Sequence, residues 1–236
     1  MRAFFKKYFT LDNVILITCL IVVTALAFIF SSLMAWLIWL SAIFGMFSSR
    51  SAANGKWLTF VYDIISYGIY IYICLSEKYF GELTLSCVII IIHIFSLIEW
   101  KNNQSSGKVI IKTLTKKEMI ITFSVASVTL VCYALVLYFV GSAFPILNAI
   151  PTIIYLLGNY FALRRSVLQF YCWIGYEIGF ITLWIIAAFN GEMGSTIFLV
   201  GGIAELIYGI FGIVNWKKIK NEQQYLSTDV HCNTKS

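Results

Sequence analysis

Long apolar segments, separated by short polar ones, run along almost the whole chain. Each of them approaches the length of about 20 residues that a helix needs to cross a hydrocarbon core about 30 Å thick. The pattern therefore predicts an all-α integral membrane protein with eight transmembrane helices. The predicted helices are Asn13–Phe30, Ser32–Phe47, Trp57–Cys74, Leu83–Trp100, Glu118–Val140, Phe144–Leu163, Val167–Phe189 and Ser195–Trp216.

The first apolar segment follows three cations, Arg2, Lys6 and Lys7, as the apolar part of a signal peptide would. Its length exceeds the roughly 7–15 residues of such a part, and no clear small-residue cleavage site follows it. It is therefore predicted to be an additional N-terminal transmembrane helix. Only Ser31 and Ser32 separate it from the second segment, so the two form either a tight hairpin or one long broken helix.

Composition and charge support the membrane interpretation. Hydrophobic residues make up 60% of the chain and charged residues 12%, which is more apolar than a soluble domain requires. If the N-terminus lies in the cytoplasm, the cytoplasmic segments hold all 17 Lys and Arg residues except Lys78. Since cytoplasmic loops are rich in these cations, we expect a multi-pass protein of the inner (plasma) membrane with cytoplasmic N- and C-termini. The net charge of +6 then requires no nucleic-acid partner.

The chain lacks the motifs of common catalytic and metal sites. None of the six cysteines forms a CxxC pair, so neither a zinc site nor a disulfide framework is indicated. There is no HExxH, GxSxG or P-loop motif, and the acidic residues in the apolar segments occur singly. The sequence therefore predicts a protein that is not an enzyme and has no catalytic residues, metal or cofactor.

Two groups of three segments share features of an internal repeat. The fourth segment ends in Glu99-Trp100-Lys101 and the eighth in Asn215-Trp216-Lys217. A three-helix unit ends on the side opposite its start, so the fifth segment restores the orientation and makes the two units parallel. Substrate sites of transporters lie between such repeats near the bilayer midplane. The predicted organisation is an N-terminal helix (1–30), a first repeat (31–102), a cytoplasmic loop and linker helix (103–142), a second repeat (143–220) and a disordered cytoplasmic tail (221–236).

Polar and aromatic residues inside the apolar segments are the candidates for substrate binding. Phe170, Trp173 and Glu177 share one helix face, and two rings with a carboxylate suit a planar cation. A carboxylate at membrane depth costs about 2.5–3.5 kcal/mol, so Glu177 should face protein or water. The alternative is an aromatic core stripe in which Glu177 bonds a neighbouring helix. The full set of candidates is Phe170, Trp173, Glu177, Asn148, Asn159, Asp63, Ser66, Tyr67 and His93, while the role of the buried acid Glu205 stays open.

Several of these residues form a pattern that resembles the nicotinamide riboside transporter family, PnuC, which is related to the SWEET sugar transporters. The resemblance runs from about Ser41 to Lys218. It is carried by His93-x-x-Ser96-x-x-x-Trp100, Pro145-x-x-Asn148-Ala149, Gly158-Asn159-Tyr160-Phe161, Arg164-Arg165 and Phe170-x-x-Trp173-x-x-x-Glu177. The family has other residues at five of these places: Asp at Asn148, Gln at Asn159, Gln at His93, Trp at Phe170 and Asn at Glu177.

The resemblance implies a SWEET-like bundle in a 3+1+3 parallel-repeat arrangement, often as a homotrimer. It implies uptake of a vitamin-like nucleoside, nicotinamide riboside first, by alternating-access facilitated diffusion. Phe170, Trp173 and Glu177 would line the substrate. Thiamine, which is also a cation, is the next candidate, followed by riboflavin or a deoxynucleoside. Two further alternatives are a non-transporting membrane scaffold or sensor, and a proton-coupled carrier that uses Glu177, Asp63 or His93 as its relay.

Overall fold

The computed structural model describes residues 11–77, 80–141, 145–189 and 195–233. Over these residues the chain forms eight helices and one short hairpin, which confirms the prediction of an all-α bundle with eight helices. Six of the described helices, α2 to α6 and α9, are long and apolar enough to cross a membrane. The elements are α2 (Leu11–Phe30), α3 (Leu33–Ala53), α4 (Leu58–Glu77), α5 (Phe80–Asn102), β1 (Gln104–Ser105), β2 (Lys108–Val109), α6 (Lys116–Phe139), α7 (Pro145–Leu163), α8 (Leu168–Phe189) and α9 (Ser195–Asn233).

The first two apolar segments form a tight helical hairpin. Ser31 adopts a left-handed conformation with a φ of 47°, and the Ser32 side chain caps α3 by accepting a hydrogen bond from the backbone N–H of Ala35 at 3.0 Å. At the far end of the pair, the Arg50 guanidinium donates to the Asp12 carboxylate at 2.8 Å. α2 and α3 are thus separate antiparallel helices and not one broken helix.

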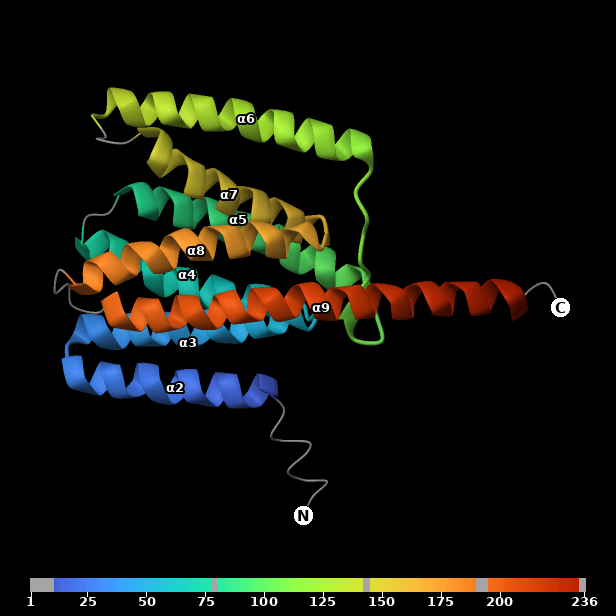
Figure 1. The fold of residues 1–236 in the computed structure, drawn as a ribbon, viewed down its shortest axis with the longest axis horizontal. Helices are drawn as coiled ribbons and strands as arrows, with labels where there is room; N and C mark the ends of the chain where they lie inside the picture. The colour runs from blue at the N-terminus through green and yellow to red at the C-terminus, as the bar shows by residue number, and fades with distance from the viewer. Residues whose placement is uncertain (1–10, 78–79, 142–144, 190–194, 234–236) are drawn as a thin grey trace, which may run out of the picture.

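Six of the described helices close into a ring. α3 packs against α4, α4 against α5, α5 against α7, α7 against α8, α8 against α9, and α9 against α3. α2 lies outside this ring against α3 and α9, and α6 lies outside it against α7, at opposite edges of the molecule in Figure 1. The helices α3–α5 and α7–α9 therefore form two halves that meet along the α3–α9 and α5–α7 contacts.

The turns that join the first two helices of each half have the same backbone geometry. Gly55 and Arg165 both adopt left-handed conformations, with φ values of 67° and 56°. Their backbone N–H groups donate to the carbonyls of Ala52 and Ala162, both at 2.9 Å. The division of the chain into two parallel repeats stays a prediction, and these matching turns support it.

The end of α9 differs from the prediction for residues 221–236. The sequence predicts a disordered tail there, whereas α9 continues as a helix to Asn233. The physical reason lies in Gln223, whose side chain accepts from the Ile111 backbone N–H at 3.1 Å and donates to the Val109 carbonyl at 2.9 Å. These bonds fasten the helix extension to the β1–β2 hairpin, a long-range contact that the local polar composition does not reveal.

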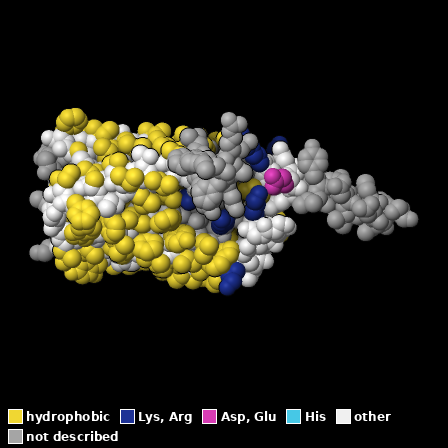
Figure 2. All heavy atoms as spheres, turned by 90° about the horizontal axis from the view of Figure 1, so that it is seen from below, with side chains coloured by type: hydrophobic (Ala, Val, Ile, Leu, Met, Phe, Trp, Pro, Cys, Tyr) yellow, Lys and Arg dark blue, Asp and Glu magenta, His cyan; other side chains and the backbone are white. Residues whose placement is uncertain are grey.

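Apolar and basic side chains lie on different parts of the surface, as expected for a membrane protein. Figure 2 shows hydrophobic side chains covering the body of the bundle on this face, while the visible Lys and Arg side chains gather towards one end. That end carries the β1–β2 hairpin, the start of α2 and the extension of α9 (Figure 1), and we call it the hairpin end. Large apolar side chains such as Phe139 and Ile120 are exposed, as expected for residues that face lipid.

Candidate functional site

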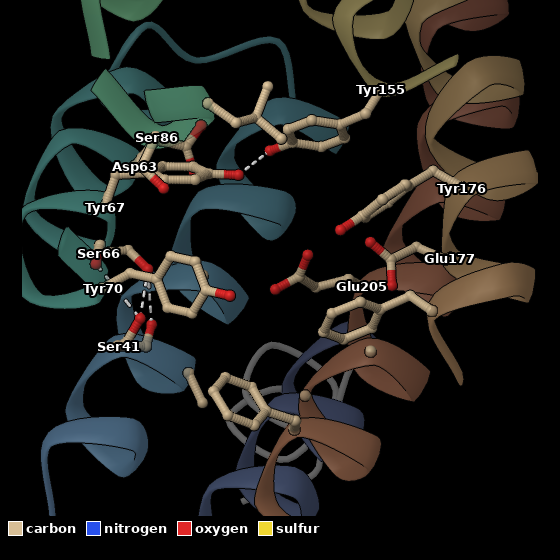
Figure 3. A pocket seen from close by; sticks show the side chains of 17 residues that line it. Ser41, Asp63, Ser66, Tyr67, Tyr70, Ser86, Tyr155, Tyr176, Glu177 and Glu205 are labelled. Atoms are coloured by element: carbon tan, nitrogen blue, oxygen red, sulfur yellow. Dashed lines mark hydrogen bonds between the residues drawn. The ribbon is translucent and has the colours of Figure 1, made fainter. Parts of the chain in front are cut away.

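A cavity of about 130 Å³ lies inside the ring of six helices. Its polar wall, drawn in Figure 3, consists of Ser41, Asp63, Ser66, Tyr67, Tyr70, Ser86, Tyr155, Tyr176, Glu177 and Glu205. A second cavity of about 50 Å³ adjoins it towards the hairpin end, where Ser48 and Ala52 near the end of α3 form part of the wall. The residues that line both cavities are Asp63, Tyr155, Glu177 and Glu205. The two cavities therefore form one polar path along the axis of the ring.

Three carboxyl groups from three different helices face this path. Asp63 comes from α4, Glu177 from α8 and Glu205 from α9. Glu177 is only 6% exposed, and its Oε2 atom has no hydrogen-bond partner. Figure 3 shows the carboxyl groups of Glu177 and Glu205 turned towards each other. The path thus has the chemistry of a site for a cation, since carboxylates are the side chains that balance positive charge.

Asp63 has a neighbouring basic group, His93. The His93 Nδ1 atom lies 3.7 Å from an Asp63 carboxylate oxygen, and its Nε2 atom lies 2.7 Å from the Asn159 side-chain oxygen. Asn159 uses its amide nitrogen to donate to the Tyr155 carbonyl at 2.9 Å, so its oxygen is the acceptor for His93. His93 Nε2 therefore donates, which leaves Nδ1 to face Asp63. The imidazole of His93 contacts both Asp63 and Asn159 and thereby connects α4, α5 and α7.

Hydroxyl groups complete the wall of the larger cavity. The phenols of Tyr67 and Tyr155 share a hydrogen bond across the boundary between the two halves of the ring. The hydroxyls of Ser41 and Ser66 lie 3.0 Å apart and join α3 to α4. Such groups both donate and accept, so they can bind the hydroxyl or amide groups of a small polar molecule.

A cluster of six residues, which we call the plug, closes the path at the hairpin end. Each helix of the ring supplies one member: Ala52, Phe60, Trp100, Ala162, Phe170 and Trp216. The indole N–H of Trp100 donates to the Ala162 carbonyl at 2.7 Å, and that of Trp216 donates to the Ala52 carbonyl at 2.9 Å. The two indoles lie 5.3 Å apart between ring centroids. Because all six residues are at most 1% exposed, nothing passes the plug in this conformation.

The structure brings most of the predicted site residues to the polar path. Asp63, Ser66, Tyr67 and Glu177 line the larger cavity, while Asn159, Phe170 and Trp173 line the smaller one together with Glu177. Phe170 also belongs to the plug, where its ring packs edge-on against Trp216 at 5.3 Å. His93 is not among the described residues that line either cavity. Asn148 lies in α7, and its side chain falls outside the described part of the structure.

Several cavity residues do not appear among the candidates from the sequence. Tyr155 lies four residues before Asn159 on one face of α7, and Tyr176 directly precedes Glu177. The sequence assigns no role to Glu205, because Glu177, which faces it in the structure, is distant along the chain. The helical spacing from Asn159 is a signal that would have identified Tyr155. Ser41 and Gly45 of α3 have no such signal, since their place at the cavity follows from the packing of α3 against α4 and α9.

Comparison with known proteins agrees with this architecture. The family described as nicotinamide mononucleotide transporter matches residues 35–218. The nicotinamide riboside transporter PnuC of Neisseria mucosa is 24% identical over 84% of this chain and 77% of its own length. The protein of the same name from Haemophilus influenzae is 25% identical over 78% of this chain and 80% of its own.

A solved structure has the same fold. The crystal structure of the vitamin B3 transporter PnuC superimposes with a TM-score of 0.77 at 22% identity, and the match covers 89% of this chain and 92% of that one. The family match extends over well more than half of the sequence and covers all or part of every helix of the ring. The chain therefore belongs to the nicotinamide mononucleotide transporter family.

Proposed function

We propose that the protein takes up nicotinamide riboside through the central cavity by alternating-access facilitated diffusion. Its family is one of membrane transporters, so the chain is a multi-pass membrane transporter and not an enzyme. The relatives from Neisseria mucosa and Haemophilus influenzae that carry the name nicotinamide riboside transporter support this choice of substrate. The vitamin B3 transporter structure with the same fold supports it as well.

The observation that carries the proposal is the combination of aromatic and acidic groups in the cavity wall. Nicotinamide riboside joins a flat pyridinium ring, which is positively charged, to a neutral ribose. The rings of Tyr67, Tyr155 and Tyr176 offer flat faces, and Glu177 offers negative charge beside them. Ser41, Ser66 and Asn159 supply donors and acceptors for ribose hydroxyls and the carboxamide.

We further propose roles for the predicted site residues. Trp173 and Phe170 would contact the pyridinium ring at the hairpin side of the site, while Asp63, Ser66 and Tyr67 would contact the substrate from α4. Asn148 would contact the substrate from the N-terminal part of α7. His93 would act through Asp63 and Asn159, which it contacts.

Alternating access requires that the plug open while the other end of the path closes. The plug contains one residue from each ring helix, so a rocking motion of α3–α5 against α7–α9 would separate its members. The bonds from Trp100 to Ala162 and from Trp216 to Ala52 run between the two halves and would break in this step.

We propose that the hairpin end faces the cytoplasm of a bacterial-type inner (plasma) membrane, with both termini on that side. The concentration of Lys and Arg at this end supports the orientation. We also propose a homotrimer. α6 supports an assembly of this kind because it packs only outside the ring and has no buried residue among those described.

Thiamine is the second candidate substrate, and one observation favours it. The acidic groups of the cavity suit a planar cation in general, and thiamine also carries a positively charged ring. Glu177 stands at a position where the nicotinamide riboside transporter pattern has Asn, so the polar groups that would contact the substrate differ from that pattern. Neutral riboflavin and deoxyadenosine would gain less from the carboxylates.

The test is binding and uptake with the purified full-length protein. Calorimetry with nicotinamide riboside, thiamine, riboflavin and deoxyadenosine would identify the ligand, and saturable uptake into proteoliposomes would show transport. We expect binding and uptake of nicotinamide riboside. Uptake of thiamine alone would replace the proposed substrate. A folded protein that binds and transports none of the four would contradict the proposal and favour the scaffold alternative.

A further inference from the structure

Glu177 and Glu205 form an acid pair without a basic partner in the wall of the cavity. The two carboxyl groups are turned towards each other in the cavity wall (Figure 3). Glu177 is 94% buried, and its Oε2 atom has no hydrogen-bond partner. Neither Lys nor Arg occurs among the described residues that line the two cavities. A buried acid of this kind normally has a counter-charge, so the pair points to a ligand that supplies one.

Two glycines allow the carboxyl groups of the pair to lie close against the helix backbones. A Cβ atom at Gly45 would lie 2.6 Å from Glu205 Oε1, and a Cβ atom at Gly202 would lie 3.2 Å from Glu177 Oε2. Both distances are shorter than ordinary contacts, so any side chain at these positions would push against a carboxyl group. The backbone of α3 and α9 therefore leaves room at the carboxyl groups themselves.

The other titratable groups around the pair do not neutralise it. α4 contributes Asp63 with Tyr67 and Tyr70, α7 contributes Tyr155, and α8 contributes Tyr176, while the lining residues of α3 and α5 carry no titratable side chain. Phenols are neutral near pH 7. His93 of α5 lies beside Asp63 and donates to Asn159, so its positive form would balance Asp63 and not the pair.

Two carboxylates that face each other inside a protein do not both keep a negative charge when no cation is near. Their repulsion is strong because the surroundings screen it poorly, and a shared proton relieves it. A cation that enters the cavity relieves the same repulsion. Proton and cation therefore compete for one site.

We propose that Glu177 and Glu205 hold one proton between them when the cavity is empty and release it when a cationic substrate binds. The inference rests on the proposed function, because nicotinamide riboside supplies the cation. In this step one carboxyl O–H bond breaks and the proton passes to water, while the pyridinium ring takes its place beside the two carboxylates. The pair thereby recognises positive charge, and binding is an exchange of a proton for a cation.

The test is calorimetry of the full-length protein at pH 6, 7 and 8, in buffers that differ in ionisation enthalpy. The probes are nicotinamide riboside and its reduced form, which has nearly the same shape but a neutral ring. We expect the cation to release between half a proton and one proton, and its affinity to rise by up to about tenfold per pH unit. The neutral form should bind more weakly and release no proton.

Two results would count against the idea in different ways. If the cation binds with the same affinity at pH 6 and pH 8 and releases no proton, the exchange is refuted while the proposed function stands. If the folded protein binds no cation at any of the three pH values, the proposed function fails and the inference fails with it.

A matched pair of variants assigns the effect to residues. Glu205→Gln keeps the size of the side chain but leaves only one acid, so we expect proton release and the pH dependence of affinity to disappear. Glu222→Gln makes the same change on the same helix at an exposed position outside the cavity, so both should stay as in the wild type. Proton release that persists in Glu205→Gln would show that this acid is not part of the exchange.

Discussion

The contact between Gly45 and Glu205 allows stability and binding to be separated by a single methyl group. In Gly45→Ala, the new Cβ would lie 2.6 Å from Glu205 Oε1, so the carboxyl group must move by about 1 Å to reach an ordinary distance of 3.4–4 Å. The end of a flexible side chain can make this movement at little cost. Alanine is also favoured over glycine inside a helix by about 0.5–1 kcal/mol. We therefore expect the folded protein to be as stable as the wild type or slightly more stable.

Binding of a cation should suffer from the same change. At an effective dielectric constant of about 20, a carboxylate about 4 Å from a positive charge contributes about 4 kcal/mol, and at about 5 Å it contributes about 3.3 kcal/mol. The loss of roughly 0.8 kcal/mol corresponds to an affinity about fourfold weaker. The same substitution is therefore expected to weaken the binding of the cation while it leaves the stability of the protein unchanged or slightly higher.

Thermal unfolding and calorimetry with nicotinamide riboside on the same preparations test this prediction. Gly68→Ala is the control, because a Cβ there would meet no atom within 4 Å, and it should change stability without changing affinity. An unchanged dissociation constant in Gly45→Ala would refute the reasoning that Glu205 contacts the charge. A large loss of stability would refute the assumption that the carboxyl group can move.

Three further variants probe other parts of the structure. Trp173→Ala should raise the dissociation constant by about 5- to 150-fold in calorimetry, since stacking on an aromatic ring contributes about 1–3 kcal/mol. Trp36→Ala in α3 should leave it unchanged, because Trp36 packs against Phe28 of α2 and lines neither cavity; equal effects would remove Trp173 from the site. Gly212→Ala should lower the unfolding temperature, because its Cβ would lie 2.2 Å from the buried Phe170 ring and overpacking costs about 1–3 kcal/mol; an unchanged melting curve would contradict this packing. Gln223→Ala should speed amide exchange in the β1–β2 hairpin about thirtyfold, as it removes two hydrogen bonds that contribute about 1 kcal/mol each; unchanged exchange would show that the hairpin holds without α9.

The helices were predictable because the bilayer imposes their length. Apolar runs of about 20 residues determine where a helix crosses, and the observed bounds differ from the predicted ones by only a few residues at most ends. The boundary at Ser31 and Ser32 was less certain, since apolar residues continue on both sides of it. There the turn depends on a left-handed Ser31 and a capping Ser32, which are features of single residues and not of a pattern.

The composition of the cavity was only partly predictable. Helical spacing placed Asp63, Ser66 and Tyr67 on one face and Glu177 on another, and the structure brings both faces to one cavity. Glu205 lies 28 positions after Glu177 in the sequence, so no local pattern pairs the two acids. Their contact follows from the packing of α8 against α9, which only the three-dimensional arrangement reveals.

The acid pair also determines how the membrane potential would act on uptake. A uniporter that carries one positive charge gains about 2.3 kcal/mol for each 100 mV of potential. If the pair holds one proton when empty and none when a cation is bound, the net charge at Glu177 and Glu205 together with the substrate is −1 in both states. The charge that crosses the membrane is then the same on the inward and the return step. With this exchange the proposed facilitated diffusion becomes coupled to the proton gradient, so uptake would follow the gradients of substrate and proton, and the membrane potential would neither drive nor oppose it.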